Sequence, residues 1–175
     1  SHRDFWIMVI DWVSDDIYTY LLDSSGVSLN PIISIADSLQ MQQGIGGTNR
    51  ANGYLKVNRQ GDRVAMGLWA ANSYDLFDFN ASTGMASNHI KIQGTQATMW
   101  KTYGVEFSPD GKKLYGTTCE NSYPANTFKL WQFDLTAGTP VDIYNSRTLI
   151  ASTSSGSYYY MALQMAPDGK IYCSL

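Results

Sequence analysis

The sequence has few charged residues and almost no histidine or cysteine. Of its 175 residues, two are histidines and two are cysteines, and charged side chains make up 15%. His2 and His89 give no recognisable zinc-ligand spacing. Cys119 and Cys173 are too few for a disulfide framework and are expected to be small buried side chains. We therefore expect no metal site and no cofactor.

Basic surface and long apolar runs are lacking as well. Twelve lysines and arginines against fifteen acidic residues give a net charge of −3, which disfavours a nucleic-acid partner. No apolar run approaches the roughly 20 residues of a membrane helix, so no membrane span is expected. The first five residues lack the anatomy of a signal peptide, which is typical of an excised fragment or a trimmed chain.

One sequence pattern occurs three times. Each copy joins two alternating apolar runs through a short turn, and the marker glycines Gly61, Gly111 and Gly169 lie 50 and then 58 residues apart. In the turn Ser108–Gly111, proline presets the first corner and glycine can adopt the left-handed conformation that closes a tight hairpin. A period of this length indicates a repeat architecture.

The chain between these turns predicts short strands and no long helix. Runs of β-branched and aromatic residues alternate with Gly, Asn, Asp and Ser. The predicted strands cover residues 5–12, 16–23, 31–36, 53–58, 63–70, 74–80, 88–93, 104–108, 112–119, 127–135, 146–151, 161–166 and 170–175. Strand alternation and strand position predict core places for Leu55, Val57, Trp69, Val105, Phe107, Trp131, Leu163 and Met165. Four antiparallel strands per period of about 50 residues describe a blade of a β-propeller.

We predict an all-β fold: a single partial β-propeller of four-stranded antiparallel blades over residues 1–175. The predicted units are a blade remnant at 1–37, full blades at about 53–93 and 104–151, and an incomplete blade at 161–175. The first unit begins at what resembles a second strand. Since propellers close with about four to eight blades, we expect missing blades from a parent chain or from other subunits.

Several segments together carry a family resemblance: residues 4–12, 18–27, 53–56, 76–84, 103–111, 131–138 and 162–172. In their order and spacing the chain resembles the YVTN/WD40-like β-propeller region of secreted Bacteroidetes proteins. In that family PKD-type modules and a gliding-motility C-terminal sorting domain often follow the propeller. The resemblance implies type IX secretion and an extracellular or cell-surface location, outer-membrane associated. It implies no known catalytic residue.

Aromatic residues gather before two predicted first strands. These are Trp100 and Tyr103 in one segment, and Tyr158, Tyr159 and Tyr160 in the other. Loops that precede first strands gather on one face of a propeller, around its channel. Exposed Trp and Tyr there would stack on sugars or anchor a protein partner. The alternative is that these rings pack between blades.

No catalytic motif is recognisable in the sequence. There is no Gly-x-Ser-x-Gly elbow, and Glu106 lies between two core positions of a predicted strand, so it should point to the opposite face. Asp23-Ser24-Ser25 and Asp37-Ser38-Leu39 look like the O-glycosylation signal described for Bacteroidetes. Ser24 and Ser38 are therefore candidate modification sites.

These observations favour a non-enzymatic binding or scaffolding module at the cell surface. Its partner would be a protein or a glycan, and its setting would be adhesion or gliding-motility-associated surface assemblies. One alternative is a propeller-type lyase or hydrolase whose catalytic residues lie in blades outside this sequence. Another is a structural subunit of a surface assembly.

Overall fold

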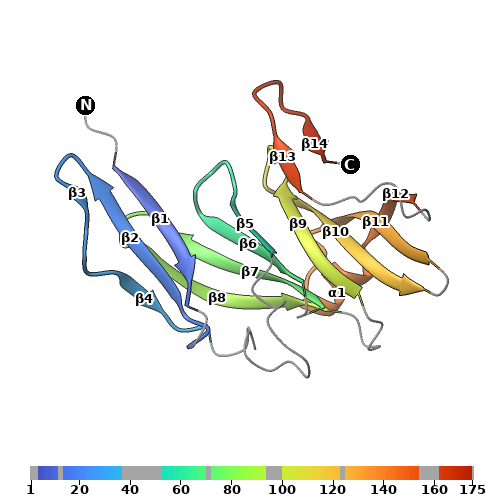
Figure 1. Ribbon diagram of the computed structural model, residues 1–175, viewed down its shortest axis with the longest axis horizontal. Helices are drawn as coiled ribbons and strands as arrows, with labels where there is room; N and C mark the ends of the chain where they lie inside the picture. The colour runs from blue at the N-terminus through green and yellow to red at the C-terminus, as the bar shows by residue number, and fades with distance from the viewer. Residues whose placement is uncertain are drawn as a thin grey trace.

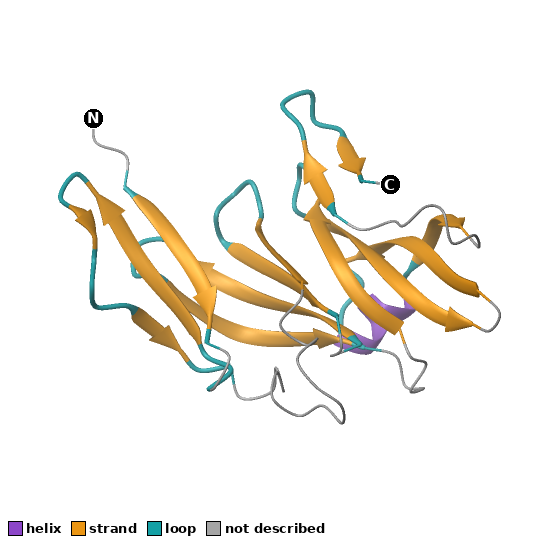
Figure 2. Cartoon of the chain, viewed as in Figure 1, coloured by secondary structure: helices purple, strands orange, loops and turns teal. Residues whose placement is uncertain are grey.

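A computed structural model describes residues 4–11, 14–36, 53–69, 72–93, 100–122, 125–153 and 162–174. Almost all of its regular structure is β-strand (Figure 2). The elements are β1 (Phe5–Ile10), β2 (Ile17–Asp23), β3 (Gly26–Val27), β4 (Ile32–Ser34), β5 (Gly53–Val57), β6 (Arg63–Leu68), β7 (Ser73–Asn80), β8 (Met85–Ile92), β9 (Trp100–Phe107), β10 (Lys113–Ser122), β11 (Ala125–Asp134), α1 (Pro140–Asn145), β12 (Thr148–Thr153), β13 (Leu163–Met165) and β14 (Ile171–Cys173).

These strands form three four-stranded antiparallel sheets and one hairpin, which stand side by side (Figure 1). In the first sheet β2 pairs with β1, β3 and β4. The second sheet has the order β5-β6-β7-β8 and the third the order β9-β10-β11-β12, while β13 and β14 form the hairpin. Consecutive antiparallel sheets stacked in this way are the blades of a propeller. The fold is thus an all-β partial β-propeller, as the sequence predicts.

The turns between first and second strands close as predicted. The amides of Gly61, Gly111 and Gly169 donate to the carbonyl three residues earlier at 3.0, 2.9 and 2.9 Å, and their φ angles are 75°, 70° and 77°. Only glycine adopts this conformation without strain. The first copy lacks proline and aspartate, but Asn58 compensates: its Oδ1 accepts two backbone amides of the turn, both at 3.0 Å.

A second turn repeats after the third strand. The side chains of Asp23, Asn80 and Asp134 each accept a hydrogen bond from the amide two residues further on, at 2.7, 2.9 and 3.0 Å. This shared Asx turn shows that β2 is the third strand of its sheet, the position that β7 and β11 hold in theirs. β1 therefore holds the second-strand position, as the sequence echo predicts.

Apolar side chains from neighbouring sheets form two cores. The first and second sheets bury Ile17, Ala36, Val64, Met66, Leu68, Phe77, Phe79 and Ala86. The second and third sheets bury Ala65, Tyr74, Leu76, Ile92, Val105, Phe107, Leu114, Phe133, Leu135 and, from α1, Ile143.

The predicted core places are partly confirmed. Val105, Phe107 and Leu163 are buried, whereas Leu55, Met165, Trp69 and Trp131 are half-buried. The prediction for Val57 is wrong, because this side chain is 43% exposed. It ends β5, and the described part of the first sheet has no strand in the first-strand position to cover it. Cys119 is buried and Cys173 half-buried.

Several strand limits differ from the prediction, and the short strand β3 and one helix were not predicted. β8 begins at Met85 and β9 at Trp100, several residues earlier than predicted. α1 was not predicted, although Thr139 and Asp142 form a capping box around its first turn. Within the described ranges, no helix is long and apolar enough to cross a membrane.

Candidate functional site

Three aromatic rings meet where the second and third sheets join. The ring centroids of Tyr54 and Tyr103 lie 5.4 Å apart at 63°, and those of Trp69 and Tyr103 lie 6.0 Å apart at 87°. All three side chains are half-buried. We call Tyr54, Trp69 and Tyr103 the aromatic group. It lies toward the ends of β5, β6 and β9 that are away from the glycine turns.

Close approach of β9 to β6 holds the aromatic group together. A Cβ at Gly67 would lie 2.5 Å from the carbonyl oxygen of Tyr103, so only glycine fits there. Thr102 fixes the same contact, because its buried Oγ1 lies 2.8 Å from the carbonyl oxygens of both Leu68 and Ser73. The second sheet therefore positions Tyr103 through its backbone.

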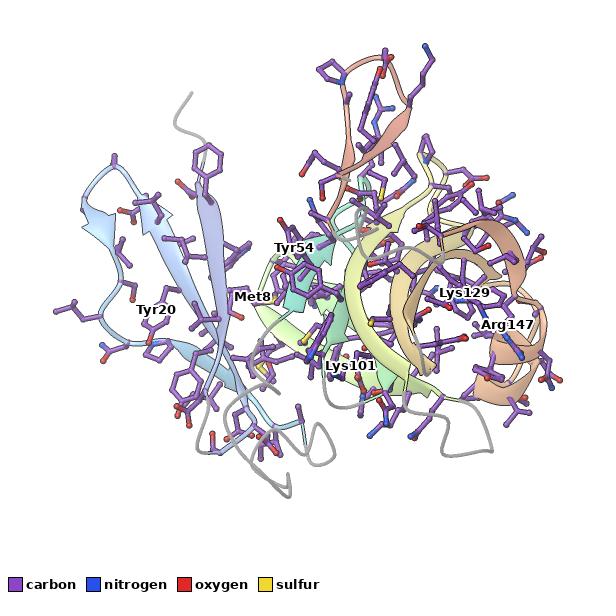
Figure 3. The ribbon with its side chains drawn as sticks, turned by 45° about the vertical axis from the view of Figure 1, so that its right-hand side comes forward. Met8, Tyr20, Tyr54, Lys101, Lys129 and Arg147 are labelled. Atoms are coloured by element: carbon purple, nitrogen blue, oxygen red, sulfur yellow. The ribbon has the colours of Figure 1, made fainter. Side chains whose placement is uncertain are left out.

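Two lysines flank the aromatic group. Lys56 Nζ lies 5.6 Å from the ring centroid of Tyr54, and Lys101 Nζ lies 5.3 Å from that of Trp69. Both distances are within the range of cation–π attraction. Figure 3 labels Tyr54 and Lys101, which come from neighbouring sheets. The group thus combines flat apolar rings with positive charge.

A buried carboxylate lies beside Lys56. Glu106 is 4% exposed; its Oε1 accepts the amide of Phe107 at 3.0 Å and its Oε2 accepts the amide of Met165 at 2.9 Å. Lys56 Nζ is 3.6 Å from Oε2 and also donates to Gln164 Oε1. A buried charge needs such partners. Glu106 thus lies on the face of β9 opposite Val105 and Phe107, as predicted, and bonds to the hairpin there.

Lys56, Glu106 and Gln164 hold the same place in the three repeats, five residues before the turn glycine. Their contacts therefore tie three successive first strands together. Sequence reasoning singled out only Glu106 among them. Aligning the repeats on their glycines would have revealed the column.

The predicted aromatic site is only partly described. Tyr103 belongs to the aromatic group, but it lies in β9 and not in a loop, so its predicted position is wrong. Trp100 begins the same strand, because pairing with β10 extends to Glu120, and its side chain lies outside what the structure describes. So do three further predicted residues: Tyr158, Tyr159 and Tyr160. Their binding role stays a prediction.

Sequence reasoning missed Tyr54, Lys56 and Lys101 as site residues and assigned Trp69 to the core. Tyr54 sits two residues before Lys56 in the first strand, a spacing that puts both side chains on one face. Of the candidate modification sites, Ser24 is exposed in the turn after β2, and Ser38 lies outside the described residues.

A second polar cluster lies inside the second sheet. Asp75 is fully buried; its Oδ1 is 2.7 Å from His89 Nε2, and its Oδ2 accepts the hydroxyl of Ser73 at 2.8 Å. The His89 ring stacks on Phe77 with centroids 4.6 Å apart. In a nucleophilic triad the serine bonds the histidine, whereas here both bond the aspartate. The cluster therefore satisfies a buried carboxylate.

The other reactive groups in the described part of the chain form no catalytic arrangement. Burial raises the pKa of the Cys119 thiol, which keeps it protonated and unreactive. Across the described ranges, no group of three or more His, Cys, Asp or Glu side chains could hold a metal ion.

Neither a protein-family model nor a curated protein matches the sequence. Among solved structures, a protein from Lactobacillus plantarum is 17% identical with a TM-score of 0.59, over 94% of this chain and 42% of that one. A candidate 6-phosphogluconolactonase from Bacteroides fragilis is 15% identical with a TM-score of 0.56, over 96% and 44%. The periplasmic gluconolactonase of Pseudomonas aeruginosa is 11% identical with a TM-score of 0.52, over 96% and 43%.

The chain thus spans less than half the length of each of these three solved structures. At these identities the likeness concerns the fold alone. Sheet topology, repeated turns and structural likeness agree on one conclusion: the chain folds as part of a β-propeller.

Proposed function

We propose that this chain is part of a propeller that binds a glycan through Tyr54, Trp69 and Tyr103. The observation that carries the proposal is the meeting of three half-buried rings at the junction of two blades. Aromatic side chains offer large apolar faces with a polar tip, which suits the flat faces of sugar rings. Lys56 and Lys101 would supply hydrogen bonds to hydroxyl or acidic groups at the edge.

Glycan-array binding of the chain and its variants tests this proposal. Tyr103→Ala and Trp69→Ala should each weaken binding about tenfold, since buried aromatic anchors contribute more than about 1 kcal/mol. Tyr172→Ala is the matched control, because Tyr172 is 56% exposed on the hairpin. Equal binding by all three variants would remove the aromatic group as the site. Binding of a protein but of no glycan would favour the protein-partner alternative.

We also propose that the propeller works at the cell surface or outside the cell. The resemblance to the propeller region of secreted Bacteroidetes proteins supports this proposal. Fractionation of the native organism with an antibody against this chain tests it. Recovery only from the cytosol would contradict it.

A second candidate function is hydrolysis of a sugar lactone. Support comes from the names of two solved structures, a candidate 6-phosphogluconolactonase and a gluconolactonase. The Lys56–Glu106 pair at the first strands offers charged groups for such chemistry. Assays with glucono-δ-lactone should show faster ring opening than in buffer, and Glu106→Gln should reduce that rate if Glu106 takes part. An unchanged rate with the native chain would exclude this candidate for glucono-δ-lactone.

A further inference from the structure

Lys101 brings a positive charge without an ionic partner to the edge of the aromatic group. It is half-buried on β9, two residues before Tyr103, and its Nζ lies 5.3 Å from the ring centroid of Trp69. None of the carboxylates in the described part of the chain lies within ion-pair distance of it. A lysine ammonium carries three N–H donors. Lys101 therefore retains the capacity to bind an anion beside the rings.

The residues across β10 leave the charge of Lys101 in place. Its cross-strand partner is Cys119, and burial raises the pKa of that thiol, so it is neutral near pH 7. The next residue, Glu120, bonds to Lys129 at 2.6 Å. Figure 3 shows Lys129 over the third sheet and Lys101 nearer the second sheet. The neighbouring strand thus supplies no negative charge to Lys101.

The second lysine beside the aromatic group, Lys56, is already compensated. Its side chain is 16% exposed, and its Nζ lies 3.6 Å from Glu106 Oε2 and donates to Gln164 Oε1. An anionic ligand that used the charge on Lys56 would have to displace Glu106, and that would deprive a buried carboxylate of its partner. Among the described groups around the aromatic rings, the uncompensated charge is therefore that of Lys101.

We propose that the sugar bound by the aromatic group is a uronic acid whose carboxylate pairs with Lys101. This inference rests on the proposed function, because it names the class of glycan that the same site takes. A uronic acid offers an apolar ring face to Tyr54, Trp69 and Tyr103 and a carboxylate at the ring edge. A charge-assisted hydrogen bond is about twice as strong as a neutral one. One ammonium balances one carboxylate, whereas a phosphate monoester would keep part of its charge unpaired.

Matched ligands separate the charge of the sugar from its shape. An array of galacturonic, glucuronic and mannuronic acid oligomers, each beside its methyl ester, compares two forms of the same skeleton of which only the acid is charged. For the sugar that fits the site, the native chain should bind the acid about tenfold more tightly than the ester, the contribution of one charge-assisted hydrogen bond. At about 1 M salt the preference should shrink, because the screening length falls to about 3 Å.

Three variants assign the preference to Lys101. Lys101→Met removes the charge and keeps the apolar stem, so it should abolish the preference for the acid and leave binding of the ester unchanged. Lys101→Arg should retain the preference, because a guanidinium also pairs with a carboxylate. Lys112→Met is the matched control: Lys112 is exposed beside the turn glycine Gly111, at the other end of β9, and its loss should change neither affinity. Thermal unfolding shows that each variant is folded.

The outcomes distinguish this inference from the proposed function. Equal binding of acids and esters would overturn the uronic acid, and so would an acid preference that survives in Lys101→Met or disappears in Lys112→Met. Tighter binding of sulfated neutral sugars than of any uronic acid would overturn the carboxylate. In each of these cases the glycan site itself stands if Tyr103→Ala still weakens binding. Binding of no acid, ester or neutral glycan would remove the proposed function, and this inference with it.

Discussion

The junction between the second and third sheets is closed, and the junction between the third sheet and the hairpin is open. Positions that are equivalent in an alignment on the Asx turns differ accordingly: Leu76 is 2% exposed, whereas Leu130 is only half-buried. Phe133 and Leu135, at the end of a third strand, belong to the core that contains Leu76. The described hairpin has no third strand to supply such residues. The side chain at this repeat position is therefore fully buried only where the third strand of the next blade packs against it.

The largest expected effect is the difference in stability loss between alanine substitutions at Leu76 and Leu130. Leu76→Ala should lower the free energy of unfolding by about 2–5 kcal/mol, because it leaves a cavity in a closed junction. Leu130→Ala should cost less than half as much, since its side chain already meets solvent. Urea unfolding measures both. Equal losses would break the comparison, because they would mean that the open junction is as well packed as the closed one.

Much of this contrast could be predicted from the sequence. The repeated turns fix the sheet boundaries, because Gly61, Gly111 and Gly169 need a conformation that other residues avoid. Alternation then gave the correct buried face for Val105 and Phe107. Turn conformation and side-chain alternation are set within one strand pair, so they can be predicted without knowing the neighbouring blade.

The remaining features depend on contacts between sheets, which one strand does not reveal. Val57 fits the apolar alternation, yet it is exposed, because burial requires a covering strand. The aromatic group likewise joins Tyr54 and Tyr103 from separate blades, across the gap that Gly67 leaves. Strand β9 was predicted too short because Thr102, a β-branched residue favourable in strands, was assigned to a loop.

The next effect tests how tightly the closed junction is packed. A Cβ at Gly116 would lie 2.4 Å from the ring of Tyr74, so Gly116→Ala should cost about 1–3 kcal/mol by overpacking. Cys173 holds the aligned place in the hairpin, since it pairs with Leu163 as Gly116 pairs with Val105. Cys173→Ala should change stability by no more than about 0.5 kcal/mol. Thermal unfolding of both variants measures the difference, and Gly116→Ala should have the lower melting temperature. Equal melting temperatures would mean that the junction between the second and third sheets is not tightly packed at Gly116.

A smaller effect is expected from one hydrogen bond across the closed junction. The Tyr74 hydroxyl donates to the carbonyl of Thr117 at 2.7 Å. Tyr74→Phe should cost about 1–2 kcal/mol near neutral pH, because a buried hydrogen bond across the junction is lost. Tyr115→Phe is the comparison at the open junction. Tyr115 is half-buried in the groove between the third sheet and the hairpin, and its hydroxyl donates to Gln132 Oε1 at 3.0 Å within the third sheet. Equal costs would show that the hydrogen bond does not depend on closure.

The same residue predicts a pH dependence. Burial raises the pKa of Tyr74 well above its ordinary value near 10. The folded state therefore holds a proton that the unfolded chain releases, and the resulting stability is present below pH 10 and lost as the pH rises further. Stability of the native chain should fall above pH 10, and Tyr74→Phe should fall less steeply. Parallel curves for the two proteins would contradict a buried, neutral Tyr74.

The smallest expected effect is on the acid dependence of stability. It should be the same at open and closed junctions, because the Asx turns are exposed at both. Lys113, followed by Thr136, lowers the pKa of Asp134, whose Oδ2 is 2.7 Å from Lys113 Nζ. Since the folded pKa is depressed, the stability it provides is present above the unfolded value of about 3.9 and lost as the pH falls through the folded value. Asp134→Asn keeps the turn acceptor, as Asn80 does in the second sheet, but removes this titration. As the pH falls, the free energy of unfolding should drop less steeply in Asp134→Asn and more steeply in Asn80→Asp than in the native chain. An unchanged slope in both variants would mean that these turns do not contribute to acid sensitivity.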